Sequence, residues 1–377
     1  MTVVYFFLIL SLLILAHEGG HFFLAKKSGI KVEEFGLGIP PRLWGIKIGE
    51  TTYSINLLPF GGFVRLYGEE GRVSKDKQRS FFGKSKKVRI GVLLAGVMMN
   101  FILAIGLFCL VYSVLGIPEQ TKQVRVLTVM EESPADRAGL KEGDVIVAVA
   151  DQEISDTGYF IEMIDQQREI PVVLKVSRSN ENPCRETIFG GDQTGGGDDN
   201  YSYCQNGQFF AVVTPRENPP DNEGAIGIII SDTQVKHYSF WKMIPKAIYS
   251  GTEEAFFWAR QMIVVLRQVL KGVFTGQGIP AEIAGPVGIY QATGAVSQSG
   301  FWALVHFTGI LSINLAIFNL IPFPALDGGR VAFVLAEKII GQRKRERIEK
   351  WANQIGMVLL ISLLIIITIN DLRRSLG

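Results

Sequence analysis

The chain is short of charged residues, and their absence is concentrated in long runs. Only 20% of its 377 residues are Asp, Glu, Lys or Arg, whereas 47% are hydrophobic and the mean hydropathy is +0.24. Three runs lack all four charged residue types, namely 90–118, 283–326 and 352–370. Each run exceeds the ~18 apolar residues that a helix needs to cross a bilayer. This composition excludes an ordinary soluble protein.

A fourth apolar stretch, residues 2–25, is interrupted only by His17, Glu18 and His21. It lacks the basic start and the small-residue cleavage site of a secretory signal peptide. We therefore expect it to remain in the protein as the first of four transmembrane helices.

The loops between the four stretches differ in charge. Residues 26–89 carry 14 Lys and Arg against 6 Asp and Glu, residues 119–250 carry 12 against 21, and residues 327–351 carry 7 against 4. Because cytoplasmic loops are enriched in Lys and Arg, we expect both basic loops in the cytoplasm, and the N-terminus and the acidic loop outside. Arg373 and Arg374 would then lie outside, against this rule, but the 14 and 7 basic residues of the two loops outnumber them.

The basic loops flank membrane stretches and lack regularly interleaved aromatic residues, so nucleic-acid binding is not indicated. The partner that these loops imply is the lipid bilayer. Only three cysteines are present. Cys109 falls in the second apolar run, while Cys184 and Cys204 fall in the acidic loop, where an oxidising exterior would permit a disulfide. The sequence leaves that bridge open.

Residues 32–67, between the first two stretches, alternate short β-prone pieces with Gly and Pro. Ile46–Ile48 and Tyr53–Ile55 predict the two strands of a hairpin. It is either a small cytoplasmic β-structure or a sheet that dips to membrane depth. Irregular backbone is tolerated at that depth only where protein shields it or water reaches it.

The acidic loop contains the only region long enough for a compact soluble domain, residues 119–235. Ser133 and Pro134 predict a helix start, Gly139 its end, and Val145–Val149 a strand. This run resembles a PDZ domain of the circularly permuted bacterial kind. Residues 179–208, rich in Gly, Asp and Asn, predict an inserted loop.

The remaining divisions follow from this domain. Residues 1–118 form the N-terminal membrane part, 236–300 a linker, and 301–377 the C-terminal membrane part. Within the linker, Thr252–Phe274 predicts an amphipathic helix that lies on the outer membrane surface or packs on the soluble domain. The fold class is therefore a polytopic α-helical membrane protein with four transmembrane helices, a membrane-associated β-hairpin sheet and an inserted α+β domain.

Histidine is scarce, with four in the chain, yet two of them form the motif His17-Glu18-Gly19-Gly20-His21. On a helix, two His four residues apart lie on one face and can share a metal ion, with Glu18 beside it. Ionisable residues in a membrane segment are costly and usually functional. The alternative is a polar helix end that reaches to the membrane surface.

A catalytic zinc site typically needs a third protein ligand. His237 falls in the acidic loop and His306 near the outer end of the third stretch, so both are poor candidates. Asp327 ends that stretch on the same side as His21 and is the better one. Its alternative role is the N-cap of a following helix, Arg330–Ile340.

These landmarks resemble the site-2 protease family of intramembrane zinc metalloproteases, in its bacterial branch with an extracytoplasmic PDZ domain. The resemblance rests on HExxH, on Gly96–Asn100, on Ala284–Ile289 and on the run from Asn319 to Gly329. Two features depart from the family pattern, Val97 in place of a common Pro and a single PDZ domain. The resemblance implies that His17, His21 and Asp327 bind zinc and that Glu18 is the general base.

The resemblance further implies that Asn319 holds the substrate backbone, unless it only ends its helix. A substrate helix must unwind before hydrolysis, and a strand of the predicted hairpin, with Ile55 and Asn56, could pair with it. The implied substrates are single-pass membrane proteins, such as anti-sigma factors or signal-peptide remnants, trimmed first by a site-1 type protease. The implied location is the bacterial inner membrane, with the active site near the cytoplasmic face.

Two other functions stay open. The same residues could serve a membrane metal transporter or sensor, although a single three-ligand cluster with a neighbouring Glu fits hydrolysis better than transport. A catalytically inactive PDZ membrane scaffold is the second alternative.

Overall fold

The fold was obtained as a computed structural model, which describes residues 1–69, 76–178, 200–205, 208–220, 223–275 and 285–376. The chain forms two compact units. The first combines Met1–Leu115 with Tyr238–Gly377, and the second is Gly116–His237.

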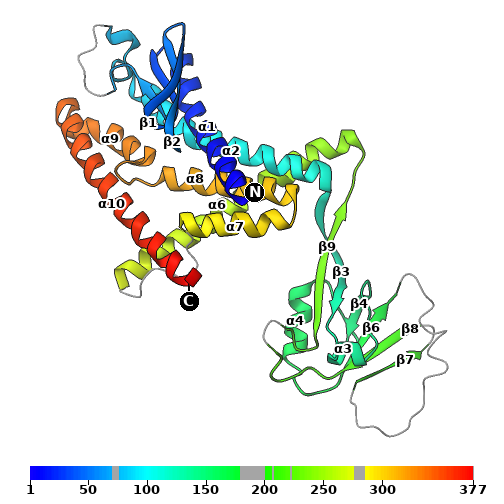
Figure 1. Cartoon of the computed structure of the whole chain (residues 1–377). Coiled ribbons are helices and arrows are strands. Elements are labelled where there is room, and N and C mark those ends of the chain that lie inside the picture. Colours follow the sequence, from blue (N-terminus) through cyan, green and yellow to red (C-terminus); the bar gives the residue numbers. More distant parts are fainter. Residues whose placement is uncertain (70–75, 179–199, 206–207, 221–222, 276–284, 377) are drawn as a thin grey trace. The chain divides into compact units, whose positions relative to one another are not determined.

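The first unit is mainly helical (Figure 1). Its helices are α1 (Thr2–Lys27), α2 (Lys86–Leu115), α6 (Phe240–Thr275), α7 (Pro286–Gln298), α8 (Phe301–Leu320), α9 (Asp327–Ile340) and α10 (Gln342–Leu376), with short 3₁₀ turns at Lys77–Arg79 and Phe81–Gly83. The expectation of four membrane helices is confirmed by length and composition, for Thr2–Lys27, Lys86–Leu115, Phe301–Leu320 and Arg347–Arg373.

The third apolar run is not one helix. It divides into α7 and α8 around Gly300, whose φ of 99° is accessible to glycine but costly for other residues. After α8 ends at Leu320, residues 321–326 follow an irregular path to α9. This path sets the position of Asp327.

Helix α2 lies at the centre of the first unit. In the most apolar 18-residue stretch of α2, 44% of the residues are buried, against 11% in that of α10. Helix α2 packs against α1, α6, α8 and α9. The side chains left exposed on α10 are mostly Ile, Leu and Val, which suits a helix facing lipid.

The predicted hairpin is confirmed, since Ile46 pairs with Tyr53 and Ile48 with Thr51. The sheet, however, is more extensive than the sequence indicated. Strands β1 (Val32–Ile48) and β2 (Thr51–Leu66) fold back, so that residues 34–37 pair with 52–55 on one side and with 62–65 on the other. Among the residues that the structure describes, segments 62–66 and 42–48 have a partner strand on one side only and form the free edges of this sheet.

The second unit is an antiparallel sheet with two short helices, α3 (Pro134–Arg137) and α4 (Thr157–Asp165). Its strands run in the order β7-β8-β6-β4-β3-β9, and β5 pairs with β4. Their bounds are β3 Ile117–Val129, β4 Val145–Val149, β5 Gln152–Glu153, β6 Val172–Ser177, β7 Tyr201–Gln205, β8 Gln208–Val213 and β9 Ile228–Lys236.

The local predictions for this unit are confirmed at its first helix. Ser133 Oγ accepts a hydrogen bond from the Asp136 N–H, Pro134 follows at the first helical position, and Gly139 has a φ of 73°. The expected loop 179–208 is too long, because residues 201–205 form β7 and pair with β8. Tyr203 stacks on Phe210 there, a cross-strand contact that composition did not reveal.

Cysteine usage is partly resolved. Cys109 is a free thiol, whereas Cys204 is disulfide-bonded. Cys184 lies outside the described residues, so its pairing with Cys204 stays a prediction.

The predicted amphipathic helix is longer than expected and belongs to the first unit. Helix α6 places four small residues on its buried face, Ala247, Gly251, Ala255 and Ala259. Their spacing of four lets α6 approach α2 closely, as small residues do between membrane helices. A Cβ built on Gly251 would lie 3.0 Å from Cys109 N and 3.2 Å from Ile105 O.

Replacing Gly251 by Leu should separate α6 from α2. Overpacking of this kind costs about 1–3 kcal/mol, so we expect a lower midpoint of thermal unfolding in detergent. Gly106→Leu is the matched control on α2, because a Cβ there meets nothing within 4 Å. Equal midpoints for the two variants would contradict the close packing of α6.

Candidate metal centre

Helix α1 carries the first two candidate ligands. His17 and His21 lie one turn apart on its buried face, and 11% of each side chain is exposed. The neighbouring α2 approaches closely here, because a Cβ on Gly20 would overlap the Ala95 carbonyl. Gly20 of the HExxH motif therefore has a packing role beside the two imidazoles, whereas a Cβ on Gly19 would meet nothing within 4 Å.

Asp327 is the first residue of α9, and the N-cap is Leu326, without a side-chain cap. The alternative reading of Asp327 as an N-cap is therefore wrong, and its carboxylate is available for another role. The preceding loop is tied to α10, since Asn353 Oδ1 accepts a hydrogen bond from the Ala325 N–H at 3.1 Å. Gly328 and Gly329 have no room for a Cβ against the carbonyls of Leu320 and Phe323, respectively.

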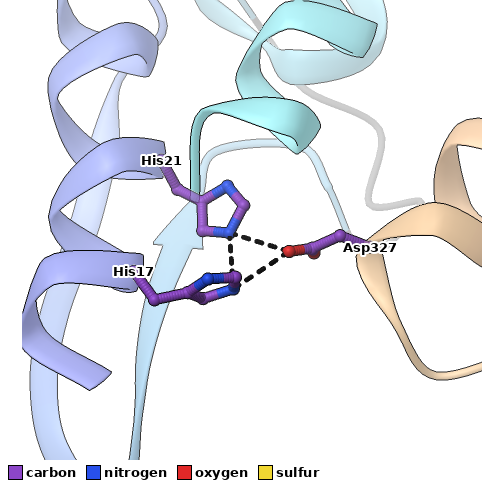
Figure 2. A group of neighbouring side chains, drawn as sticks. All are labelled: His17, His21 and Asp327. Carbon is purple, nitrogen blue, oxygen red and sulfur yellow. Dashed lines mark hydrogen bonds and ion pairs between the residues drawn. The ribbon is translucent and has the colours of Figure 1, made fainter. Parts of the chain in front are cut away.

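The three side chains converge from two helices that are 300 residues apart in the sequence (Figure 2). The Nε2 atoms of His17 and His21 are 3.3 Å apart, and Asp327 Oδ2 lies 3.0 Å from the first and 3.2 Å from the second. A tetrahedral zinc ion with ligands at 2.0–2.1 Å separates its ligand atoms by about 3.3 Å. The observed spacing fits zinc.

The proton positions also fit a cation. His21 Nδ1 lies 2.7 Å from the Val92 carbonyl oxygen, which can only accept, so Nδ1 carries the proton and Nε2 of the neutral ring has a lone pair. In the neutral ring, that lone pair and the Asp327 carboxylate oxygen point at the same position and can bind one cation. A ligating His fixed by a backbone carbonyl is the usual arrangement.

Two residues of α2 complete the surroundings. A Cβ on Gly96 would overlap the His21 ring and lie 2.8 Å from His17 Cε1, so only glycine leaves space for both imidazoles. Asn100 is fully buried, with its amide nitrogen 3.5 Å from His17 Nδ1 and its amide oxygen unpaired. An amide turned by 180° would accept the Nδ1 proton and free Nε2 for the metal.

Glu18 lies between the two His on α1 and is half-buried. It faces the sheet, since a Cβ on Gly62 would be 3.2 Å from Glu18 Cγ. The candidate general base therefore adjoins the free edge formed by residues 62–66.

The predicted substrate-binding residues are placed differently. Asn319 is near the end of α8, and its amide donates to the Leu315 carbonyl at 3.1 Å, so it is turned toward its own helix. Ile55 pairs with both Leu37 and Trp44, and the Asn56 amide donates to the carbonyls of Leu37 and Gly38. Ile55 is therefore paired on both sides and offers no free edge to a substrate strand, whereas the substrate role of Asn56 stays a prediction.

The other histidines take no part in this cluster. His306 Nε2 lies 2.7 Å from Glu254 Oε1 of α6, and His237 belongs to the second unit. Among the residues that the structure describes, His17, His21 and Asp327 are the one group of His, Cys, Asp or Glu that could hold a metal ion. The contact of His21 with the Val92 carbonyl was not predicted from the sequence, because every residue has a backbone carbonyl and the side chain of Val92 gives no sign of this role.

Known proteins similar to this chain are named as zinc metalloproteases, in agreement with the geometry of the three-residue cluster. The model of Peptidase family M50 matches residues 5–363. A Clostridium perfringens protein named "Putative zinc metalloprotease" is 32% identical over 374 residues, covering 99% of this chain and 98% of the relative. Zinc metalloprotease RasP of Oceanobacillus iheyensis is 29% identical over 452 residues, covering 99% of both chains.

Replacing Gly96 by Ala should displace one or both imidazoles. We expect the affinity for zinc to fall at least about tenfold, as it does when the support of a ligand is lost. The measurement is zinc per chain after dialysis against graded chelator. Gly91→Ala is the control on the same helix, because its Cβ would make only an ordinary contact with Leu24 at 3.5 Å. Unchanged zinc retention in Gly96→Ala would contradict this packing.

Proposed function

Because the chain belongs to peptidase family M50, the site-2 protease family of zinc metalloproteases, we propose that it is an intramembrane endopeptidase that cuts transmembrane segments of single-pass membrane proteins. The observation that carries the proposal is the position of the three-ligand cluster. Two ligands lie within an apolar helix long enough to span the bilayer, and the third begins α9, just after another such helix. A metal site among these helices would act on peptide bonds of a substrate segment that lies within the membrane.

Hydrolysis divides the work between the metal and Glu18. Zinc, when bound, polarises the scissile carbonyl and allows a water molecule to attack near neutral pH. Glu18 accepts the proton of that water as the new C–O bond forms, and delivers it to the amide nitrogen as the C–N bond breaks.

The substrate must present an extended backbone, because a helix hides its peptide bonds. The sheet edge at residues 62–66 offers strand pairing beside Glu18, and it takes that role in place of Ile55, which is paired on both sides. Asn319 could contribute after its amide turns away from Leu315. A substrate segment paired with residues 62–66 would lie directly beside Glu18.

The cellular setting follows the charge pattern. We place the N-terminus and the second unit outside the cytoplasm and the metal centre near the cytoplasmic face of a bacterial plasma membrane. The second unit acts as a PDZ-like size filter or peptide reader that admits substrates already trimmed by a site-1 type protease. The reaction is then one step of regulated intramembrane proteolysis, with anti-sigma factors or signal-peptide remnants as substrate types.

Glu18→Gln should strongly slow cleavage without removing zinc. General bases contribute about 10²- to 10⁴-fold, so we expect kcat to fall within that range. The measurement is cleavage of a single-pass reporter in liposomes, with bound zinc determined in both proteins. Cleavage that survives the substitution would exclude this mechanism. Zinc without cleavage in the wild type would favour the inactive scaffold, and zinc flux into vesicles would favour the transporter.

The position of the substrate can be tested by disulfide cross-linking in a Glu18→Gln chain with Cys109 replaced by Ala. A reporter cysteine beside the scissile bond should cross-link to Arg65→Cys on the proposed edge. Lys47→Cys, on the opposite free edge, is the control and should give little product. Equal or reversed yields would contradict pairing at residues 62–66.

A further inference from the structure

One face of α9 carries more than the metal ligand. Asp327, Arg330, Val334 and Glu337 fall on the same side of the helix, since spacings of three, seven and ten residues share a face. Val334 is 1% exposed, whereas Leu335 and Ile339 on the other side are 61% and 90% exposed. The buried face of α9 therefore carries the metal ligand Asp327, followed by the charged residues Arg330 and Glu337.

Arg330 connects this face to the β-sheet. Its Nη2 forms an ion pair with Glu69 Oε1, and Glu69 Oε2 accepts a hydrogen bond from the Leu66 N–H at 3.3 Å. Leu66 is the last residue of the free edge 62–66. Glu69 thus bridges the end of the edge to the first turn of α9, one turn beyond Asp327.

Glu337 anchors the other end of the same face. It pairs with Arg89 of α2 at 2.8 Å and with Arg345 of α10 at 3.1 Å. The hydrogen bond from Arg89 lowers the pKa of Glu337, which keeps the carboxylate ionised. Arg330 Nε also lies 3.9 Å from Glu349 Oε1 of α10, so α9 is fixed to the helices by both charged positions. Among the ion pairs of the described residues, Arg330–Glu69 is the one that ties α9 to the end of the sheet edge.

We infer that Arg330 and Glu69 are positioning residues that set the register of the substrate strand against the metal centre. The inference rests on the proposed function, in which the substrate pairs along residues 62–66. The scissile carbonyl must then coincide with the position between Glu18 and Asp327. A sheet edge free to shift along α9 would present neighbouring peptide bonds instead.

The reason is geometric. Successive residues of a strand are about 3.3 Å apart, so a small displacement of the edge exchanges one peptide bond for the next. A misplacement of about 1 Å can already cost about 100-fold in rate. An ion pair in partly buried surroundings is stiffer and stronger than an exposed one, and 27% of Arg330 and 18% of Glu69 are exposed.

The experiment compares wild type, Glu69→Gln, Arg330→Gln and Arg330→Lys on a single-pass reporter in liposomes. It measures zinc per chain, kcat and KM, and the bonds cut, by mass spectrometry of the products. For both Gln variants we expect zinc retained, kcat lowered about 10- to 100-fold with KM changed less than about threefold, and cleavage spread over neighbouring bonds. Arg330→Lys, which keeps the charge, should restore cleavage at the wild-type bond.

The matched control is the exposed pair Glu50–Arg79, also at the sheet, with oxygen and nitrogen 2.6 Å apart. Glu50→Gln removes the same charge from a side chain 37% exposed, and it should leave the cut bond and kcat unchanged. Glu69→Gln leaves α9 untouched, so it provides the test even where Arg330→Gln impairs folding.

Two results would overturn the inference while the proposed function stands. One is cleavage at the single wild-type bond with kcat within about twofold in both Gln variants. The other is loss of zinc in both, which would make the pair a support for Asp327 alone. A wild type that holds zinc but cuts no reporter would instead refute the proposed function itself, and the register inference with it.

Discussion

The structure depends on bringing two imidazoles and a carboxylate together inside an apolar helical unit. Ionisable groups are expensive in such surroundings unless they pair or bind a metal. Here they lie 3.0–3.3 Å apart and are held by α1 and α9, and α2 packs against both helices. The close approach needs glycine, because a Cβ on Gly20 or Gly96 would collide with the facing helix. The metal centre and the helix packing are thus one arrangement.

Irregular backbone is concentrated around this centre. The path 321–326 into α9 is held by α10 through Asn353 and Gly356, the latter against Pro324. The sheet of β1 and β2 pairs its interior segments on both sides and leaves an edge beside Glu18. A strand edge without a partner strand leaves backbone donors and acceptors that an extended peptide can pair with.

Charged groups away from the metal tie the same elements together. Glu337 joins α9 to α2 and α10, and Arg330 joins it to Glu69 beyond β2. Removing one partner of such a pair is costly because a buried charge is left unpaired. These pairs therefore fix the orientation of α9 more than they add stability. A site assembled from distant segments requires such fixed orientations.

The sequence by itself determined the membrane class, four apolar helices, the hairpin of Ile46–Ile48 with Tyr53–Ile55, the cap at Ser133 and the identity of the metal cluster residues. Each is a local signal, namely a charge-free run, a turn residue, a cap or a motif. Only the tertiary structure decided that α6 packs on α2, that residues 201–205 form a strand, that Ile55 has a partner strand on both sides, and that Val92 fixes His21. These facts depend on which backbone surfaces meet across the chain, and the identity of a single residue does not encode its distant neighbour.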